Sequence, residues 1–225
     1  MSKVFFVPTP VGNLKDITLR ALDVLKSADI ILAEDTRHSK KLLQHYNIQK
    51  PLIAYHMHNE HRKTDEIIEK IKNENIHAAV ITDAGTPGIS DPGFLLARSC
   101  IEKNIEIECL PGPSSFIPAL VSSGFPCDRF IFEGFLPPKK GRKTRLQKIA
   151  DNPYTSVIFE SPYKLKKTLL ELQEICNHNR AIVVAKELTK VHEKFYRGKV
   201  GNILEQIPDR EIKGEFIIIL GGKET

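Results

Sequence analysis

The stretch ITDAGTPGISDPG, residues 81–93, directly follows an apolar run and holds three glycines and two prolines. Its glycines permit a positive φ or the close approach of another group, while its prolines remove conformational freedom. One interpretation is a turn into a helix over residues 93–103, with Asp91 as the cap. The other is a ligand-binding loop, because open α/β sheets bind ligands beyond the carboxyl ends of their strands.

A second loop of the same kind favours ligand binding. LPGPSSF, residues 110–116, again follows a strand-like run and offers proline, glycine and small hydroxyl side chains where a helix begins. Both loops would then lie at one edge of one sheet. The nucleotide-binding motifs are missing, since the chain contains no G-x-G-x-x-G and GRKT, residues 141–144, lacks the earlier glycine that a P-loop requires.

Apolar, β-branched runs alternate with helical patterns along the chain, which predicts an α/β fold. We expect strands at residues 4–8, 29–34, 52–56, 78–83, 105–111, 129–135, 155–160, 181–188, 193–200 and 215–220. Helical segments are expected at residues 16–28, 60–73, 93–103, 114–124 and 203–206. This rhythm predicts two α/β lobes, residues 1–113 and 114–225, with five-stranded mixed sheets. The last two strands need not be parallel to the others, and a cleft between lobes would suit a small ligand.

Composition places the chain among ordinary globular proteins. It is 41% hydrophobic and 27% charged, with a formal net charge of +5. No apolar run approaches the ~20 residues that span a bilayer, and the start MSKVFFVPTP lacks the features of a signal peptide. We therefore expect a cytoplasmic protein with no membrane partner.

The motifs, taken in order, resemble the tetrapyrrole methylase superfamily of S-adenosylmethionine enzymes. They are VPTPVGNLKDITLRALDVLKSADIILAEDTR, HNE, TDAGTP, PGPSS, DRFIFEGFLPPKKGRK and KELTK. Within that superfamily they look most like the enzymes that methylate RNA of the small ribosomal subunit. The likeness covers essentially the whole chain. It implies the tetrapyrrole methylase fold, a cofactor between the lobes, a homodimer, and methylation of a cytidine ribose 2′-hydroxyl in 16S ribosomal RNA.

The resemblance also implies which residues bind S-adenosylmethionine. Carried over position by position, they are Val11, Gly85, Thr86, Pro87, Ile89, Ser114, Ser115, Glu160 and Gly214. Because this cofactor carries a sulfonium and no phosphate, the bare loop backbone would provide shape and amide contacts. No metal is implied.

A base that accepts the hydroxyl proton would assist the transfer by roughly 10²- to 10⁴-fold. Glu34 and Asp35 at the end of one predicted strand are candidates, and Lys186 and Glu187 at the end of another are the alternative. Each pair is equally compatible with a strand-end ion pair or a helix cap, so the sequence leaves the base open.

Basic and amide side chains are expected to hold the RNA. Arg37 in AEDTR and Asn59 in HNE suit phosphate and ribose contacts. KKGRKTRLQK, residues 139–148, holds six Lys or Arg in ten positions, and Lys139, Lys140 and Arg142 are its predicted phosphate contacts. A charge run is also typical of a solvated face.

Other functions remain open at this stage. HMHNEH, residues 56–61, has the H-x-H-x-x-H spacing of binuclear metal hydrolases, through His56, His58 and His61. A non-catalytic RNA-binding protein on a methylase scaffold would be expected to have lost the cofactor loops. A porphyrinoid methylase or a diphthine synthase would not explain the basic segment or AEDTR.

Overall fold

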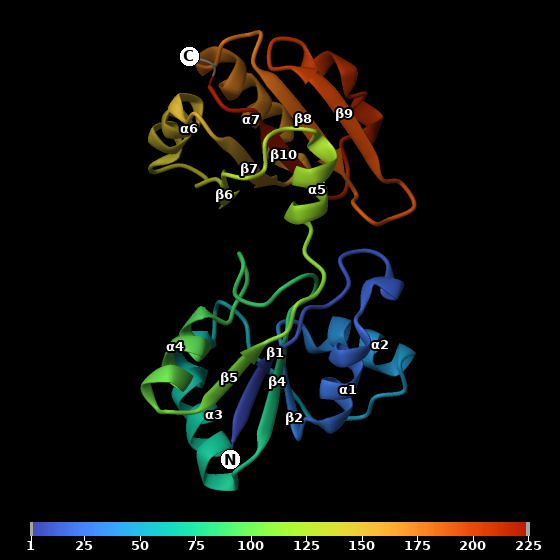
Figure 1. The fold of residues 1–225 in the computed structure, drawn as a ribbon, viewed down its shortest axis with the longest axis vertical. Helices are drawn as coiled ribbons and strands as arrows, with labels where there is room; N and C mark the ends of the chain where they lie inside the picture. Colours follow the sequence, from blue (N-terminus) through green and yellow to red (C-terminus); the bar gives the residue numbers. More distant parts are fainter. Residues whose placement is uncertain (1, 224–225) are drawn as a thin grey trace. The chain divides into compact units, whose positions relative to one another are not determined.

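A computed structural model describes residues 2–223 of the chain. The described residues form two compact units, the first ending at Ser114 and the second beginning at Ser115 (Figure 1). This division lies one residue from the boundary expected between 113 and 114.

The first unit contains a five-stranded sheet in the order β3-β2-β4-β1-β5. Its strands are β1 (Lys3–Phe6), β2 (Ile30–Ala33), β3 (Leu52–Ala54), β4 (His77–Ile81) and β5 (Glu106–Cys109). All its neighbouring strands are parallel, so this sheet is not mixed. The reason is that each strand returns through a crossover connection, which parallel pairing requires.

Helices cover both faces of this sheet (Figure 1). They are α1 (Leu19–Ser27), α2 (Thr36–His45), α3 (Glu60–Glu74) and α4 (Phe94–Glu102), with a short 3₁₀ helix η1 (Leu14–Asp16). Leu25 of α1 packs with Ile31 and Ile81 on one face, and Ile71 of α3 packs with Leu32 on the other. Double coverage explains why these strands read as continuous apolar runs in the sequence.

The second unit has a mixed five-stranded sheet in the order β6-β7-β10-β8-β9. Its elements are α5 (Phe116–Ser123), β6 (Phe130–Phe135), α6 (Arg142–Asp151), β7 (Thr155–Glu160), α7 (Pro162–Ile175), β8 (Ala181–Lys186), β9 (Lys194–Lys199), η2 (Ile203–Gln206), η3 (Asp209–Glu211) and β10 (Phe216–Leu220). β6 and β7 are parallel, whereas β10 runs antiparallel to both β7 and β8. The expectation that the last strands depart from the parallel direction is confirmed.

Every predicted strand is present, but the helices α2, α6 and α7 lie outside the predicted ranges. In α6 the buried Leu146, Ile149 and Ala150 are interspersed among lysines and arginines, which hides the apolar stripe. The helix expected from residue 16 begins at Leu19, because the Thr18 side chain caps it by accepting a hydrogen bond from the Ala21 amide at 3.0 Å.

Arg180 joins the end of α6 to the end of β10. Its buried guanidinium donates to the carbonyl oxygens of Gly221 at 2.7 Å and Asn152 at 3.2 Å, and also to those of Ile149 and Ala150. Arg180→Ala should lower the free energy of unfolding by about 3 kcal/mol, because buried carbonyl groups lose their donors. Urea denaturation followed by circular dichroism measures this loss.

The matched control is the exposed Arg129, whose replacement by Ala should change the free energy of unfolding by less than about 0.5 kcal/mol. Equal effects in the two variants would show that the Arg180 contacts are not important for stability.

Candidate active site

The loops that follow β1, β4 and β5 are joined at one edge of the first sheet. The Gly85 amide and carbonyl exchange 2.9 Å hydrogen bonds with Thr9, which follows β1. The Thr86 hydroxyl donates to the Pro113 carbonyl at 3.1 Å. The two loops singled out in the sequence therefore lie together, at the edge where open α/β sheets bind ligands.

The loop after β4 requires glycine at two positions, Gly85 and Gly93. Gly85 has a φ of +85° and Gly93 a φ of +137°, which other residues rarely adopt. A Cβ at Gly93 would lie 3.2 Å from the Phe6 ring, so this part of the loop closes onto the end of β1. At Gly85 a Cβ would approach only Pro113 O, at 4.0 Å, so the space in front of Gly85 is open to a ligand.

The other predicted cofactor residues of the first unit lie in the same loops. Pro87 is buried, while the apolar side chain of Ile89 is 40% exposed. Val11, in the loop after β1, and Ser114 are each partly exposed. Ser115 begins the second unit as the N-cap residue of α5, and its side chain makes no capping hydrogen bond.

Glu160 and Arg142 belong to a buried network in the second unit. The Glu160 carboxylate accepts from the Ser161 amide at 2.8 Å and from the Thr168 hydroxyl at 2.5 Å. Arg142, 4% exposed, donates to Thr168 at 2.6 Å and to Glu171 at 2.8 Å. The prediction that Arg142 binds RNA phosphate is therefore wrong, because its guanidinium is used inside the unit. The carboxylate of Glu160 is likewise occupied.

Of the first pair of base candidates, only Glu34 remains. Asp35 caps α2 by accepting from the Arg37 amide at 2.8 Å, and it also pairs with the Arg37 guanidinium. Hydrogen bonds from Arg37 hold the Asp35 pKa well below its usual range, so Asp35 is a poor proton acceptor. Glu34 accepts from the Asp83 amide at 3.3 Å, and burial raises the Glu34 pKa.

The second pair of base candidates serves the fold instead. Lys186 is 4% exposed and pairs with Glu211 at 3.8 Å. Glu187 accepts from the Lys190 ammonium at 2.9 Å. A Cβ at Gly214, where φ is +84°, would collide with the Glu187 carboxylate. This packing explains the glycine at 214 without a ligand, and both Lys186 and Glu187 are paired with residues of their own unit.

Asn59 and the histidines form a turn between β3 and α3. The Asn59 side chain accepts from the His56 amide at 2.9 Å and donates to the Ala54 carbonyl at 3.1 Å, so it closes this turn, and its RNA contact stays a prediction. Within residues 2–223 no three His, Cys, Asp or Glu are placed to hold a metal ion. The histidine spacing therefore gives the hydrolase alternative no geometric support. Arg37, by contrast, exposes 89% of its side chain.

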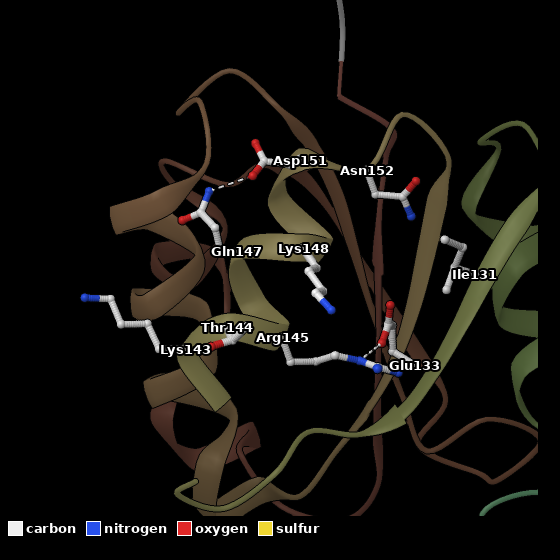
Figure 2. A pocket seen from close by; sticks show the side chains of 9 residues that line it. All are labelled: Ile131, Glu133, Lys143, Thr144, Arg145, Gln147, Lys148, Asp151 and Asn152. Carbon is white, nitrogen blue, oxygen red and sulfur yellow. Dashed lines mark hydrogen bonds and ion pairs between the residues drawn. The ribbon is translucent and has the colours of Figure 1, made fainter. Parts of the chain in front are cut away.

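A hollow of about 800 Å³ lies between α6 and the edge strand β6 (Figure 2). It is lined by Ile131, Glu133, Lys143, Thr144, Arg145, Gln147, Lys148, Asp151 and Asn152. Figure 2 shows Arg145 and Lys148 extending from α6 towards β6, where Arg145 pairs with Glu133. Lys139 and Lys140 are exposed just before this helix. Lys143 extends the other way in Figure 2, so the exposed basic side chains of this run lie on more than one side of α6, with Arg142 as its buried anchor.

The profile of the tetrapyrrole (corrin/porphyrin) methylases matches residues 3–204. The chain belongs to this family, which makes it a methyltransferase with S-adenosylmethionine as methyl donor. It is 43% identical to the ribosomal RNA small subunit methyltransferase I of Thermotoga maritima, over 100% of both chains. It is 46% identical to the enzyme of that name from Synechocystis, over 99% of this chain and 80% of the relative.

Solved structures of the family share the fold. A cobalt precorrin-4 methyltransferase matches with a TM-score of 0.70 at 19% identity, over 97% of this chain and 94% of the other. Uroporphyrin-III-C-methyltransferase from Thermus thermophilus matches with a TM-score of 0.64 at 21% identity, with the same coverage. Among the residues that the structure describes, no helix is long and apolar enough to cross a membrane.

Sequence reasoning missed the two aspartates that edge the glycine loop. Asp91 does not cap α4, because the N-cap residue is Gly93 and no side chain caps that helix. Asp83 instead accepts a hydrogen bond from the Asp35 amide at 3.3 Å, beside Glu34. One feature of the sequence could have drawn attention to them: residues 81–93 contain Asp83 and Asp91 but no lysine or arginine to pair with them.

Gly85→Val should abolish binding of S-adenosylhomocysteine while the protein stays folded. The new side chain would enter open space in front of the loop and would strain a residue with φ of +85°. Gly124→Val is the matched control, because Gly124 also has a positive φ (+75°) with no other atom near its Cβ position. Calorimetric titration should show full binding in the Gly124 variant, and retained binding in the Gly85 variant would contradict the site.

Proposed function

We propose that this protein methylates the ribose 2′-hydroxyl of a cytidine in 16S ribosomal RNA of the small ribosomal subunit. The observation that carries the proposal is full-length similarity, at 43% and 46% identity, to enzymes named ribosomal RNA small subunit methyltransferase I. The second of these, from Mycoplasmopsis pulmonis, matches over 100% of both chains.

The loop after β4 fits the methyl donor. Gly85 leaves open space, and Ile89 offers an exposed apolar surface beside it. Gly85, Thr86, Pro87 and Ile89 would hold the cofactor together with Ser114. S-adenosylmethionine supplies an electrophilic methyl group on a sulfonium. The protein must then orient the acceptor hydroxyl and exclude water, and proximity and orientation can supply up to ~7–11 kcal/mol of the barrier reduction.

The cationic surface of α6 would hold the RNA backbone. Lys139 and Lys140 are exposed, and Lys143 and Lys148 line the hollow beside β6. Lysine ammonium groups suit phosphate, and such contacts position an RNA without reading its sequence. Arg142 contributes indirectly by anchoring the start of α6 through Glu171 and Thr168.

A porphyrinoid substrate is the weaker alternative. The solved porphyrinoid methyltransferases resemble the chain at only 19% and 21% identity, which supports the shared fold and not a shared substrate. The relatives named for ribosomal RNA are more than twice as similar. The expected homodimer rests on the resemblance and the expected cytoplasmic location on sequence features, and both stay predictions.

The test is incubation of the purified protein with tritiated S-adenosylmethionine and small ribosomal subunits that lack methylation. Nuclease digestion and mass spectrometry should then find 2′-O-methylcytidine at one position, and the Gly85→Val variant should give none. Label in a porphyrinoid but not in RNA would refute the proposal.

Replacing Lys139, Lys140 and Lys143 together by Gln should weaken RNA binding and flatten its salt dependence. Each lost phosphate contact should lower the slope of log K against log salt by about 0.7 for single strands or 0.9 for duplex, because fewer counterions are released. Filter binding at several salt concentrations measures the slope. The control removes the same charge from Lys26, Lys72 and Lys103, which are exposed in the first unit. An unchanged slope in the first variant would make residues 139–143 a solvated surface.

A further inference from the structure

Three acidic residues lie in the loops at the edge of the first sheet that carries the glycine loop. Glu34 follows β2 and Asp83 follows the neighbouring strand β4. The two residues are linked through the backbone, since Glu34 accepts from the Asp83 amide and Asp83 accepts from the Asp35 amide, both at 3.3 Å. Asp91 of the glycine loop is the third, and it lies between Gly88 and Gly93 of that loop.

Asp91 has none of the partners that normally accompany a half-buried carboxylate. Among residues 2–223, no hydrogen bond or ion pair is made by its side chain. Arg37, the cation next to this cluster in sequence, pairs with Asp35 instead. Burial first, and then the charges of Glu34 and Asp83, raise the Asp91 pKa to about 7. A carboxyl left in this state weakens the fold, so its placement calls for a functional reason.

A buried hydroxyl points to a ligand at the same place. Thr82 is 2% exposed, and its Oγ1 atom is buried without a hydrogen-bond partner. Along β4, Ala78 and Val80 face the cluster under α3 and α4, while Ala79 and Ile81 face the other side. Strand alternation therefore directs Thr82 to the face under α3 and α4.

Strand alternation directs Glu34 to that same face. Leu32 of β2 belongs to the cluster under α3 and α4, and alternation gives Glu34 the same direction. The register pairs Ala33 with Ile81, so the next residues, Glu34 and Thr82, are cross-strand neighbours. An unsatisfied hydroxyl thus stands beside an acidic group at the end of the sheet.

The glycine loop brings Asp91 over this face. The close approach of Gly93 to Phe6 fixes the carboxyl-terminal part of the loop on the side of the sheet where Phe6 lies, which is the face of Glu34 and Thr82. Gly85, in front of which a ligand has open space, begins the same loop. One segment of nine residues, 85–93, therefore carries both the expected cofactor contacts and an unpaired carboxyl.

We propose that Asp91 is the general base of the methyl transfer. The proposal rests on the proposed function, because it requires a hydroxyl acceptor. Asp91 takes the proton of the ribose 2′-hydroxyl as the hydroxyl oxygen bonds to the methyl carbon. The electron pair of the broken carbon–sulfur bond stays on sulfur, so the sulfonium becomes a neutral thioether. Charge balances, since one carboxylate and one sulfonium are both neutralised.

The neighbouring charges suit this role. Burial raises the pKa of Asp91, and the negative charges of Glu34 and Asp83 raise it further, while the charge of His56 opposes the effect of burial on the Glu34 pKa. A base with its pKa near the working pH combines a useful ionised fraction with a strong pull on the proton. Glu34, Asp83 and Asp91 do not form a metal site, because no three His, Cys, Asp or Glu among residues 2–223 are placed to hold a metal ion.

Ionisation of Asp91 also links the site to stability. The folded pKa of about 7 lies above that of an unfolded aspartate, so the unfolded state releases the proton at lower pH. Wild-type stability should therefore fall, relative to Asp91→Asn, as the pH rises from about 4 to about 7, and should change no further above that range. A residue whose carboxylate stabilised the fold would show the opposite sign.

The test compares wild type, Asp91→Asn and Asp16→Asn, the last being an exposed aspartate of the same unit. With 16S RNA as substrate, kcat of Asp91→Asn should fall roughly 10²- to 10⁴-fold and lose the rise with pH centred near 7. Its Kd for S-adenosylhomocysteine, measured by calorimetry, should stay within about threefold of wild type. Asp16→Asn should match wild type throughout.

Each other result has its own meaning. Wild-type activity that Asp91→Asn retains would overturn the role of Asp91 while the proposed function stands. A matched loss of S-adenosylhomocysteine binding would make Asp91 part of the cofactor site and would also overturn it. Absence of RNA methylation in wild type itself would refute the proposed function. Glu34→Gln should shift the pH midpoint of kcat downward, since removing a negative neighbour favours the ionised Asp91.

Discussion

The parallel register of the first sheet is the constraint on which the site depends. Because β1, β2, β3, β4 and β5 all run in one direction, their carboxyl ends open at one edge. The loops singled out by their glycines and prolines are forced together there, and Gly85 is fixed to Thr9 by paired hydrogen bonds. An antiparallel strand among these five would have sent one loop to the opposite edge.

The loops at this edge lower the stability of the folded protein. The glycine loop holds residues at positive φ, and the edge gathers Glu34, Asp83 and Asp91 with no cation between them among the described residues. The buried sheet beneath supplies the compensating energy, since both of its faces are covered by the apolar sides of amphipathic helices. Strain and like charges are tolerated at functional sites for this reason.

In the second unit, two buried arginines and the exposed lysines of the basic run have different roles. Arg142 and Arg180 are buried and bind oxygen atoms of their own unit, while Lys139, Lys140 and Lys143 are exposed. The guanidinium presents several donors in a fixed plane, which lets it join elements far apart in sequence. A basic segment can therefore contain both buried residues that hold the fold together and exposed charged residues, and its composition alone does not distinguish them.

The sequence by itself determined the strands, the two α/β units and the loops at the strand ends, because apolar periodicity and glycine–proline spacing are local properties. Motifs spread over the whole chain also indicated the family to which it belongs. Only the tertiary structure decided which polar groups are available: it assigned Asp35 to a helix cap, Asn59 to a turn, and Lys186 and Arg142 to buried pairs. The same structure placed the loops that carry Glu34 and Asp91 after neighbouring strands, although α2, β3 and α3 lie between them in the chain. Hydrogen-bond partners and burial come from groups distant in sequence, so residue type and spacing alone do not specify them.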